Sequence, residues 1–265
     1  MKKFIIFFLL SILILNSTSV LAFSKDITPE AHYAIAIDGK TKKILYEKRG
    51  FENVPMASTT KMLTALIAIN YGNLDDQVEI SKNAASIRGS KVGYRTGEKI
   101  SLRELTWGLM FKSGNDAAIA IAEHLGGSVE GFSVIMNDFA KMIGIIDSNF
   151  QSPHGLDSQM HFSSAYDLAV LGAKAMENET FKEIVSSKEL PKSTSGFSRD
   201  YNNINKILWR IPGANGIKTG YTGQAGKCLV TSVNHNNRNI IIVVLNCPER
   251  WKVTEKIYDY IKKDL

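Results

Sequence analysis

The stretch from Pro55 to Leu66 limits what this chain can fold into more than any other, because it places a hydroxyl and an amine at the start of an apolar helix. Ser58 and Lys61 are three residues apart and therefore share one helical face. Residues 62–69 are almost all apolar, which is typical of a helix that crosses a protein core, and we expect this helix to end near Gly72. Burial lowers the pKa of such a lysine, so that the neutral amine of Lys61 can take the proton from Ser58 and make the hydroxyl a nucleophile. The alternative is a solvated lysine one turn beyond an exposed serine.

The N-terminus has the pattern of a secretory signal peptide. Lys2 and Lys3 precede an apolar run at residues 4–15, and small residues stand before a cleavage point after Ala22. The apolar run is shorter than the roughly 20 residues that a membrane-spanning helix needs, so we favour cleavage over a retained anchor. We therefore expect an exported, extracytoplasmic protein in which residues 1–22 are the signal peptide and residues 23–265 form a single domain.

The remaining composition is that of an ordinary globular domain, with 44% hydrophobic and 22% charged residues. Without Lys2 and Lys3, 30 basic residues face 26 acidic ones, so the net charge is about +4. The basic residues form no block with interleaved aromatic residues, and we predict no nucleic-acid partner. The five histidines are scattered without the spacing of a metal site, so we predict neither a metal nor another cofactor.

Strand-like runs lie near both ends of the chain, and helices lie between them. The expected strands are Tyr33–Ile37, Ile44–Tyr46, a segment from Ile217, Lys227–Val233 and Ile240–Leu245. The expected helices are one that begins with the capping box Ser101–Glu104, then Ala117–Leu125, Phe132–Met142, one from the capping box Ser164–Asp167 to about Met176, and Trp251–Lys263. The pattern predicts an α+β fold, with an antiparallel sheet built from both termini, flanking helices and an inserted helical region at about residues 75–185. We expect the last helix to pack on the sheet rather than on a membrane surface.

Three short motifs occur together in the chain. Ser58-Thr59-Thr60-Lys61 begins a helix, Ser113-Gly114-Asn115 lies between two helices, and Lys218-Thr219-Gly220 lies in a strand. Ser-x-Asn also occurs elsewhere in the chain, so this motif is a weak signal alone. The order and the structural settings are, however, those of the three active-site motifs of penicillin-binding proteins and serine β-lactamases. Their joint occurrence is a strong indication of this kind of site.

The residues around the motifs are more specific than the motifs themselves. They include Ala57–Ala65, Lys112–Ala118, Met136-Asn137, Pro153–Leu156 and Gly216–Thr222. On these residues, the chain resembles the low-molecular-mass D-alanyl-D-alanine carboxypeptidases, which are penicillin-binding proteins and form the S11 family of serine peptidases. The resemblance implies the β-lactamase/transpeptidase-like fold, removal of the terminal D-alanine from peptidoglycan stem pentapeptides, and covalent inhibition by β-lactam antibiotics. Many members carry a C-terminal β-rich domain and a C-terminal membrane anchor; because this chain stops about fifteen residues beyond Trp251, we expect neither.

The resemblance also implies catalytic roles. Ser58 is expected to attack the carbonyl between the last two D-alanines, with Lys61 as the base, and to form an acyl-enzyme as D-alanine leaves. The backbone N–H groups of Ser58 and Tyr221 are expected to bind the oxyanion, a contribution of about 3–4 kcal/mol for each donor. Ser113 is expected to pass a proton to the departing amine.

Other motif residues are expected to bind the substrate. Asn115 can present its amide to the substrate backbone and to Lys61. Lys218 and Thr219 can bind a terminal carboxylate, and Gly220 leaves room for an extended peptide that pairs with this edge strand.

Three alternative functions are open. A class A β-lactamase uses a Glu-x-x-Leu-Asn run for deacylation, and no such run lies between Asn115 and Lys218, which disfavours this activity. Endopeptidase or transpeptidase action on peptide cross-links uses the same residues as the carboxypeptidase reaction. A non-catalytic wall-binding protein needs none of the motif residues.

The cysteines, Cys228 and Cys247, lie on consecutive predicted strands. With the turn centred on residues 236–237, Cys228 is expected to face Leu245, and Cys247 to lie diagonally on the same face, roughly 7–8 Å away. This distance is too long for easy bridging, so we predict two free, buried thiols despite export. His154 has no evident chemical task, and we expect it to be structural.

Overall fold

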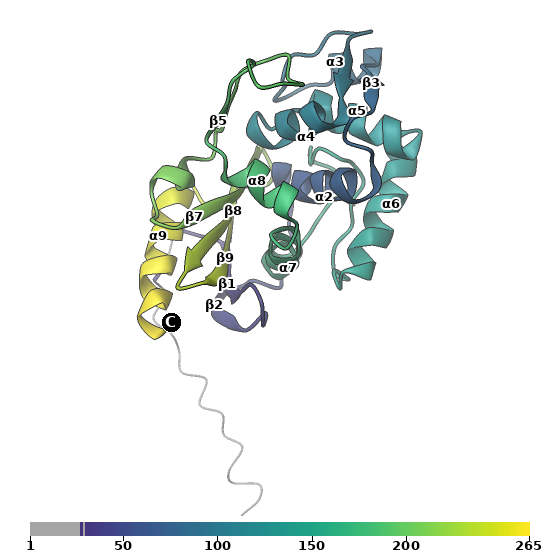
Figure 1. The fold of residues 1–265 in the computed structure, drawn as a ribbon. Helices are drawn as coiled ribbons and strands as arrows, with labels where there is room; N and C mark the ends of the chain where they lie inside the picture. The colour runs from purple at the N-terminus through teal and green to yellow at the C-terminus, as the bar shows by residue number, and fades with distance from the viewer. Residues whose placement is uncertain (1–26, 29) are drawn as a thin grey trace, which may run out of the picture.

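The computed structural model describes residues 27–28 and 30–265. The predicted signal peptide at residues 1–22 lies outside this part of the chain. Of the helices described, none combines the length and the apolarity needed to cross a membrane. A central antiparallel sheet and two layers of helices make up the described chain (Figure 1).

A five-stranded antiparallel sheet joins the two ends of the chain, in the order β2-β1-β9-β8-β7. Its strands are β1 (Tyr33–Asp38), β2 (Ile44–Lys48), β7 (Ala214–Thr222), β8 (Gly226–His235) and β9 (Arg238–Leu245). β1 pairs with β9 from Tyr33 opposite Leu245 to Asp38 opposite Ile240. The predicted sheet built from both termini is therefore confirmed, and β7 forms one of its edges.

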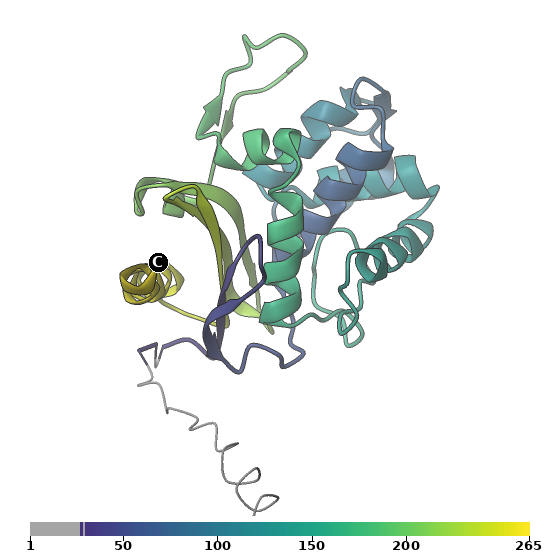
Figure 2. The same cartoon turned by 60° about the horizontal axis from the view of Figure 1, so that its bottom comes forward.

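The helical region lies between β2 and β7 in the sequence and covers one face of the sheet, except that Ile207 of its last short helix lies in the core on the opposite face (Figures 1 and 2). Its helices are η1 (Ala57–Thr60), α2 (Lys61–Tyr71), α3 (Lys82–Ser86), α4 (Leu102–Phe111), α5 (Asn115–Gly126), α6 (Val129–Met142), α7 (Ala165–Ala175), α8 (Glu179–Ser186) and η2 (Lys206–Trp209). Its short strands are β3 (Gln77–Glu79), β4 (Lys99–Ser101), β5 (Glu189–Leu190) and β6 (Tyr201–Asn202). The predicted α+β architecture is confirmed, although the sequence pattern does not predict α3 or α8, which have only 5 and 8 residues.

The central strand β9 is apolar on both of its faces because helices cover both faces of the sheet. Ile241, Val243 and Leu245 belong to the core beneath the helical region. The alternate residues, from Ile240 to Val244, belong to a second core beneath α9 (Arg250–Ile261). Figure 2 shows these two layers on opposite sides of the sheet.

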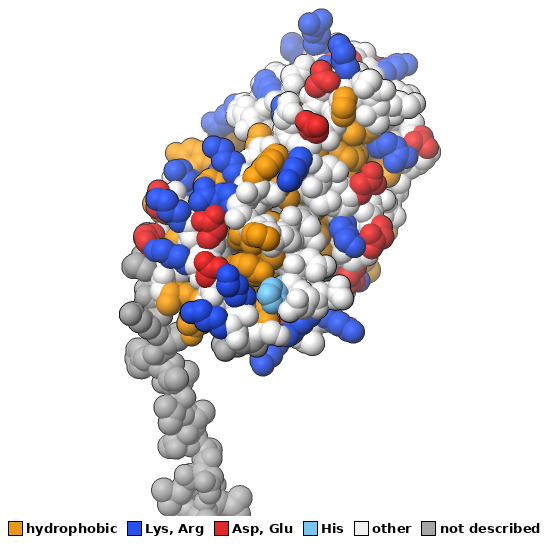
Figure 3. Space-filling view, turned by 60° about the vertical axis from the view of Figure 1, so that its left-hand side comes forward, with side chains coloured by type: hydrophobic (Ala, Val, Ile, Leu, Met, Phe, Trp, Pro, Cys, Tyr) orange, Lys and Arg blue, Asp and Glu red, His pale blue; other side chains and the backbone are white. Residues whose placement is uncertain are grey.

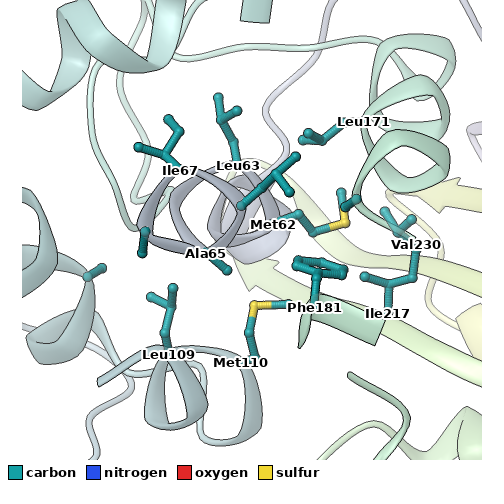
Figure 4. Close-up of a cluster of buried hydrophobic side chains, with 14 of the residues drawn as sticks. Met62, Leu63, Ala65, Ile67, Leu109, Met110, Leu171, Phe181, Ile217 and Val230 are labelled. Atoms are coloured by element: carbon teal, nitrogen blue, oxygen red, sulfur yellow. The ribbon is translucent and has the colours of Figure 1, made fainter. Parts of the chain in front are cut away.

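The helix α2 runs through the larger core, as its composition predicts. Its residues from Lys61 to Ala68 are all buried, and it ends at Tyr71, directly before Gly72. In Figure 4, side chains point outward from several sides of α2 and meet side chains from the surrounding helices and strands. The labelled members of this cluster are Met62, Leu63, Ala65, Ile67, Leu109, Met110, Leu171, Phe181, Ile217 and Val230.

The helix α9 covers the other face of the sheet. Val253, Ile257 and Ile261 are buried in the second core, so the prediction that this helix packs on the sheet is confirmed. Its outer side carries ion pairs, such as the one of 2.8 Å between Lys256 Nζ and Glu30 Oε1. Figure 3, in which the left-hand side of Figure 1 comes forward, shows positive and negative side chains interspersed on this part of the surface.

Two predicted capping boxes are only partly correct. The hydroxyls of Ser101 and Ser164 cap α4 and α7 by accepting hydrogen bonds from the N–H groups of Glu104 and Asp167, at 3.1 and 3.0 Å. The Glu104 carboxylate does not return the bond to Ser101, because it accepts from the N–H and the hydroxyl of Ser198 instead, at 2.9 and 2.7 Å. Glu104 is 2% exposed, and a buried carboxylate requires such donors.

Cys228 and Cys247 are both free and buried, as predicted. They do not share a face of the sheet, because Cys228 belongs to the core beneath the helical region and Cys247 to the core beneath α9. Asn246, which follows β9, has a φ of 46°. This left-handed residue ends the regular alternation of side chains and turns Cys247 to the opposite face. The predicted shared face is therefore wrong.

Candidate active site

Ser58 lies in the single turn η1, directly before α2. The two threonines between Ser58 and Lys61 stabilise this turn, because Thr59 Oγ1 and Thr60 Oγ1 donate to preceding backbone carbonyls at 2.6 and 2.9 Å. The carbonyl that accepts from Thr60 belongs to Ala57, whose φ is 51°. Ser58 remains partly exposed, whereas Lys61 is wholly buried.

The amine of Lys61 has three hydrogen-bond partners. Its Nζ lies 2.9 Å from Ser58 Oγ, 2.7 Å from Asn115 Oδ1 and 2.7 Å from the backbone oxygen of His154. The oxygens of Asn115 and His154 can only accept, so a neutral amine donates its two hydrogens to them. Its lone pair then points to Ser58, whose hydroxyl can donate. This arrangement places the lone pair of an amine against a hydroxyl, which is the geometry that transfer of a proton from Ser58 to Lys61 needs.

Burial holds the pKa of Lys61 well below its usual range, and the nearby charge of Lys218 lowers it further. The carboxylate of Asp116 acts in the opposite direction but is the smallest of the three effects. The predicted buried lysine with a lowered pKa is therefore confirmed in its direction.

The second motif forms the turn between α4 and α5. Ser113 is 5% exposed and has a φ of 58°, so its backbone is left-handed. Asn115 begins α5, and its Nδ2 donates to the backbone oxygen of Arg88 at 2.7 Å. This bond fixes the orientation of the amide, so that Asn115 Oδ1 faces Lys61. The first two motifs thus meet through the contact between Asn115 and Lys61.

Asp116 is a neighbour of the site that motif reasoning missed. Its carboxylate is fully buried and accepts from the N–H groups of Val92, Gly93 and Tyr94, at 3.0, 2.8 and 3.2 Å. These charge-assisted bonds hold residues 92–94 against the start of α5. The available sequence signal is a single carboxylate directly before the apolar run at residues 117–122.

The third motif lies on the edge strand β7. Lys218 and Thr219 are 1% and 6% exposed, and Lys218 Nζ donates to the Thr219 carbonyl at 2.9 Å. Burial, followed by the charge of Arg250, lowers the pKa of Lys218 to about 7. Lys218 is therefore close to the midpoint of its titration at neutral pH.

Gly220 brings β7 next to the nucleophile. A Cβ atom at this position would lie 3.1 Å from Ser58 N and 3.0 Å from Ala57 Cβ, so a side chain would push the strand away from η1. Tyr221, the next residue, is 67% exposed. The first and third motifs therefore meet where a glycine permits close contact between two backbones.

The loop that contains His154 contacts Lys61 through its backbone. Its backbone carbonyl is one of the two acceptors of Lys61, whereas its ring nitrogen Nδ1 accepts from the N–H of Leu156 at 3.1 Å. Burial lowers the pKa of His154 to about 3, so the ring is neutral. The next residue, Gly155, has a φ of 85°, and a Cβ atom there would lie 2.0 Å from the Ala57 oxygen. The ring has the structural role that we predicted, but the sequence does not indicate the part played by the carbonyl.

The family model of the D-alanyl-D-alanine carboxypeptidases, peptidase family S11, matches residues 20–249. The chain belongs to this family. Two S11 relatives are the D-alanyl-D-alanine carboxypeptidases DacF of Bacillus subtilis (strain 168), 34% identical over 246 residues, and DacC of Escherichia coli (strain K12), 33% identical over 256 residues. Each match covers 89% of this chain and 63% of the relative, so the chain spans less than two thirds of the length of these relatives.

Solved structures of S11 relatives match almost the whole described fold. The crystal structure of the Streptomyces K15 DD-transpeptidase is 30% identical with a TM-score of 0.82, and covers 88% of this chain and 97% of that one. The D-alanyl-D-alanine carboxypeptidase of Mycobacterium tuberculosis H37Rv is 29% identical with a TM-score of 0.84, and the match covers 92% of this chain and 95% of that one. The predicted family and the predicted fold class are both confirmed.

In this S11 domain, the three motifs that are far apart in the sequence come together at the start of α2. Ser58 and Lys61 contact Asn115 on one side and lie beside Gly220 on the other. Within the described part of the chain, no group of three His, Cys, Asp or Glu side chains is placed to hold a metal ion.

Proposed function

We propose that this chain is a serine-type D-Ala-D-Ala carboxypeptidase, which removes the terminal D-alanine from peptidoglycan stem pentapeptides through an acyl-enzyme on Ser58. The observation that carries this proposal is the 2.9 Å contact between Ser58 Oγ and a buried Lys61 whose other two partners are obligate acceptors. A wall-binding protein without catalysis has no need of a buried amine held in this way.

In the first step, Lys61 takes the Ser58 proton and the oxygen attacks the carbonyl carbon of the penultimate D-alanine. The oxyanion is bound by the N–H groups of Ser58 and Tyr221, which the approach of Gly220 to Ser58 N brings close together. The Lys61 proton passes through the hydroxyl of Ser113 to the departing amine, and the peptide bond breaks. Water then hydrolyses the ester, which releases the shortened peptide and restores Ser58.

The substrate binds along the open edge of β7 as an added strand. Asn115 contacts its backbone, while Thr219 and the ammonium form of Lys218 bind its terminal carboxylate. The closeness of the Lys218 pKa to neutral supports this role, because a bound carboxylate favours the protonated amine.

The site of action is outside the cytoplasm, in the cell envelope, where such stem peptides are exposed. The signal-like residues 1–22 support export, and residues 23–265 constitute the peptidase domain. β-Lactam antibiotics acylate the same serine and remain attached, because the opened ring keeps its leaving group tethered and shields the ester from water.

The decisive experiment is the intact mass of the protein after incubation with benzylpenicillin. We expect an increase by the mass of one penicillin, located on the peptide that contains Ser58, and none in the Ser58→Ala variant. In parallel, a peptide that ends in D-Ala-D-Ala should release D-alanine over many turnovers. An intact mass that is unchanged by penicillin, together with no release of D-alanine, would contradict the proposal.

Transpeptidation is a second candidate. The Streptomyces K15 relative is a DD-transpeptidase, and the match to this chain covers nearly the whole length of that relative. The two reactions differ only in whether water or an amine resolves the acyl-enzyme. Adding glycine or isotopically labelled D-alanine as an acceptor during peptide turnover distinguishes them. A product that contains the added amine supports transpeptidation, whereas only the hydrolysed peptide supports the carboxypeptidase.

A further inference from the structure

Arg250 contacts the back of the third motif from the other side of the sheet. Its Nη1 donates to the carbonyl oxygens of Gly220, at 2.7 Å, and Cys228, at 3.1 Å. Gly220 and Cys228 are direct partners in the pairing of β7 with β8. A side chain of α9 therefore bonds to the strand pair that carries the motif, and α9 lies beside these strands in Figure 1.

The bond to Gly220 acts on one particular peptide group. The carbonyl of Gly220 and the N–H of Tyr221 belong to the same planar unit, and in a trans peptide they point in opposite directions. A donor on the Gly220 oxygen therefore fixes the direction in which the Tyr221 N–H points. It also polarises the unit, since hydrogen bonds in a chain strengthen one another.

The position of Arg250 is electrostatically unfavourable, apart from its bonds to the two strand carbonyls. It is the first residue of α9, where the helix dipole disfavours a positive charge, and no acidic residue lies in that first turn. Partial burial lowers its pKa, and its Nε is buried without a hydrogen-bond partner among the described residues. The guanidinium lies over the Trp251 ring, 4.7 Å from the centroid, which holds its plane beneath the strands.

The other predicted oxyanion donor is held in a comparable way. The Ser58 N–H shares its peptide group with the Ala57 carbonyl, which accepts from Thr60 Oγ1 at 2.9 Å. Thr60 is in turn 2.8 Å from Nε2 of His161, whose Nδ1 accepts from a backbone N–H, so Nε2 carries the hydrogen and donates. Both peptide groups are therefore fixed from their carbonyl ends by side chains.

We propose that Arg250 is a positioning residue of the oxyanion site, which holds the Gly220–Tyr221 peptide group so that the Tyr221 N–H points at the reacting carbonyl. This inference rests on the proposed function. It implies that Arg250 contributes to the rate of acylation and not to the affinity for unreacted substrate.

The test compares Arg250→Met and Arg250→Lys with the wild type. We expect Arg250→Met to lower the rate constant for acylation of Ser58 by benzylpenicillin about ten- to a hundredfold, less than the 10²- to 10³-fold cost of removing an oxyanion donor itself. Arg250→Lys, which retains a cationic donor, should recover part of this loss. Arg210→Met is the matched control, since Arg210 bonds to Glu255 of α9 at 2.7 Å and, among the described residues, makes no hydrogen bond to β7.

Affinity for unreacted substrate is measured separately by calorimetry with a D-Ala-D-Ala peptide, with Ser58→Ala added to each protein to prevent turnover. At about pH 5, where Lys218 is protonated whether or not the charge of Arg250 is present, we expect the dissociation constant to be the same with and without Arg250→Met. A loss confined to this dissociation constant would instead make Arg250 a substrate-binding residue and overturn the inference. An acylation rate within twofold of wild type in Arg250→Met would also overturn it.

Two further outcomes separate misfolding and failure of the function itself. If Arg250→Met unfolds at the assay temperature, the Arg250→Lys variant provides the test. The shorter lysine places its donor at a different point from the guanidinium, so an acylation rate equal to that of the wild type would contradict the positioning role of Arg250. If the wild type itself is not acylated, both the proposed function and this inference fail. If the wild type is acylated and the variants match it, only the inference fails.

Discussion

Replacing Asn115 by Asp tests whether Lys61 acts as a neutral base. The substitution preserves size and shape but places a carboxylate where Asn115 Oδ1 now lies, 2.7 Å from Lys61 Nζ. At this distance and an effective dielectric constant of about 20, the attraction between full charges is ~6 kcal/mol. Desolvation of the new carboxylate opposes this attraction. The net effect of an opposite charge at such a site is to favour the protonated form of the lysine by about 1.4–4 kcal/mol.

The direction of the pH effect follows from the proton balance. Lys61 is active when neutral, and the new carboxylate stabilises its protonated form. At any pH on the acid side of the profile, the neutral fraction therefore falls by about ten- to a thousandfold, since 1.4 kcal/mol is a factor of ten. The acylation rate should fall by the same factor, and the acid limb of the profile should move to higher pH.

The assay is the rate of acylation by a fluorescent penicillin between pH 5 and pH 11, compared with the wild type. Asn178→Asp is a matched control, because Asn178 caps α8 with its Oδ1, an aspartate retains that bond, and the residue of α2 that Asn178 contacts is Asn70, at the opposite end of the helix from Lys61. Alkaline pH should restore most of the lost rate in Asn115→Asp. A loss of equal size at every pH would refute the reasoning, because the bond from Asn115 Nδ2 to the Arg88 oxygen, which an aspartate also loses, does not depend on the ionisation of Lys61.

Three other predictions can be checked independently. In urea unfolding, Gly155→Ala should destabilise the fold by about 2–5 kcal/mol more than Gly196→Ala. Both glycines have φ near 85°, but a Cβ atom at residue 155 would lie 2.0 Å from a backbone oxygen, whereas one at residue 196 would meet nothing within 4 Å. Equal losses of stability in the two variants would exclude the clash. The affinity for a peptide carboxylate should weaken as the pH rises through about 7, where Lys218 loses its proton, and this dependence should vanish in Lys218→Met; a flat wild-type profile would contradict the proposed role. A thiol reagent should label Cys228 and Cys247 only after denaturation, because both are buried, and labelling of the native protein would contradict the described packing.

Much of the fold can be predicted because elements that are covered on both faces have long apolar runs in the sequence. The continuous apolar run of β9 and the apolar helix α2 both indicate burial, and both are buried. Short elements are harder to predict, since the 5 residues of α3 contain too few periods to distinguish a helix from a loop. The side chain of Cys247 was misplaced because one left-handed residue, Asn246, reverses an alternation that sequence spacing assumes to continue.

The motif side chains of the site were predictable, but their supports were not. His154 contacts Lys61 through a carbonyl, and every residue has one, so no side-chain pattern marks this contact. Arg250 lies thirty positions after Gly220, and its contact exists only once α9 has folded back across the sheet. Glu104 was expected to close a local capping box, yet tertiary burial directed its carboxylate to Ser198. Local sequence predicts local bonds, and these three bonds are not local.

The pairing of β1 with β9 determines when the site can come into existence. Tyr33 pairs with Leu245 across more than two hundred residues, so the first strand has no neighbour on that side until nearly all of the domain has been synthesised. Closing such a long loop is entropically costly, and folds with many distant contacts form slowly. Ser58 comes from one end of the chain and β7 from the other, so a nascent chain holds Ser58 without the strand that lies beside it in the folded domain. We expect chains truncated before β9 to be protease-sensitive and inert to penicillin, with reactivity appearing in one late step as the two ends meet.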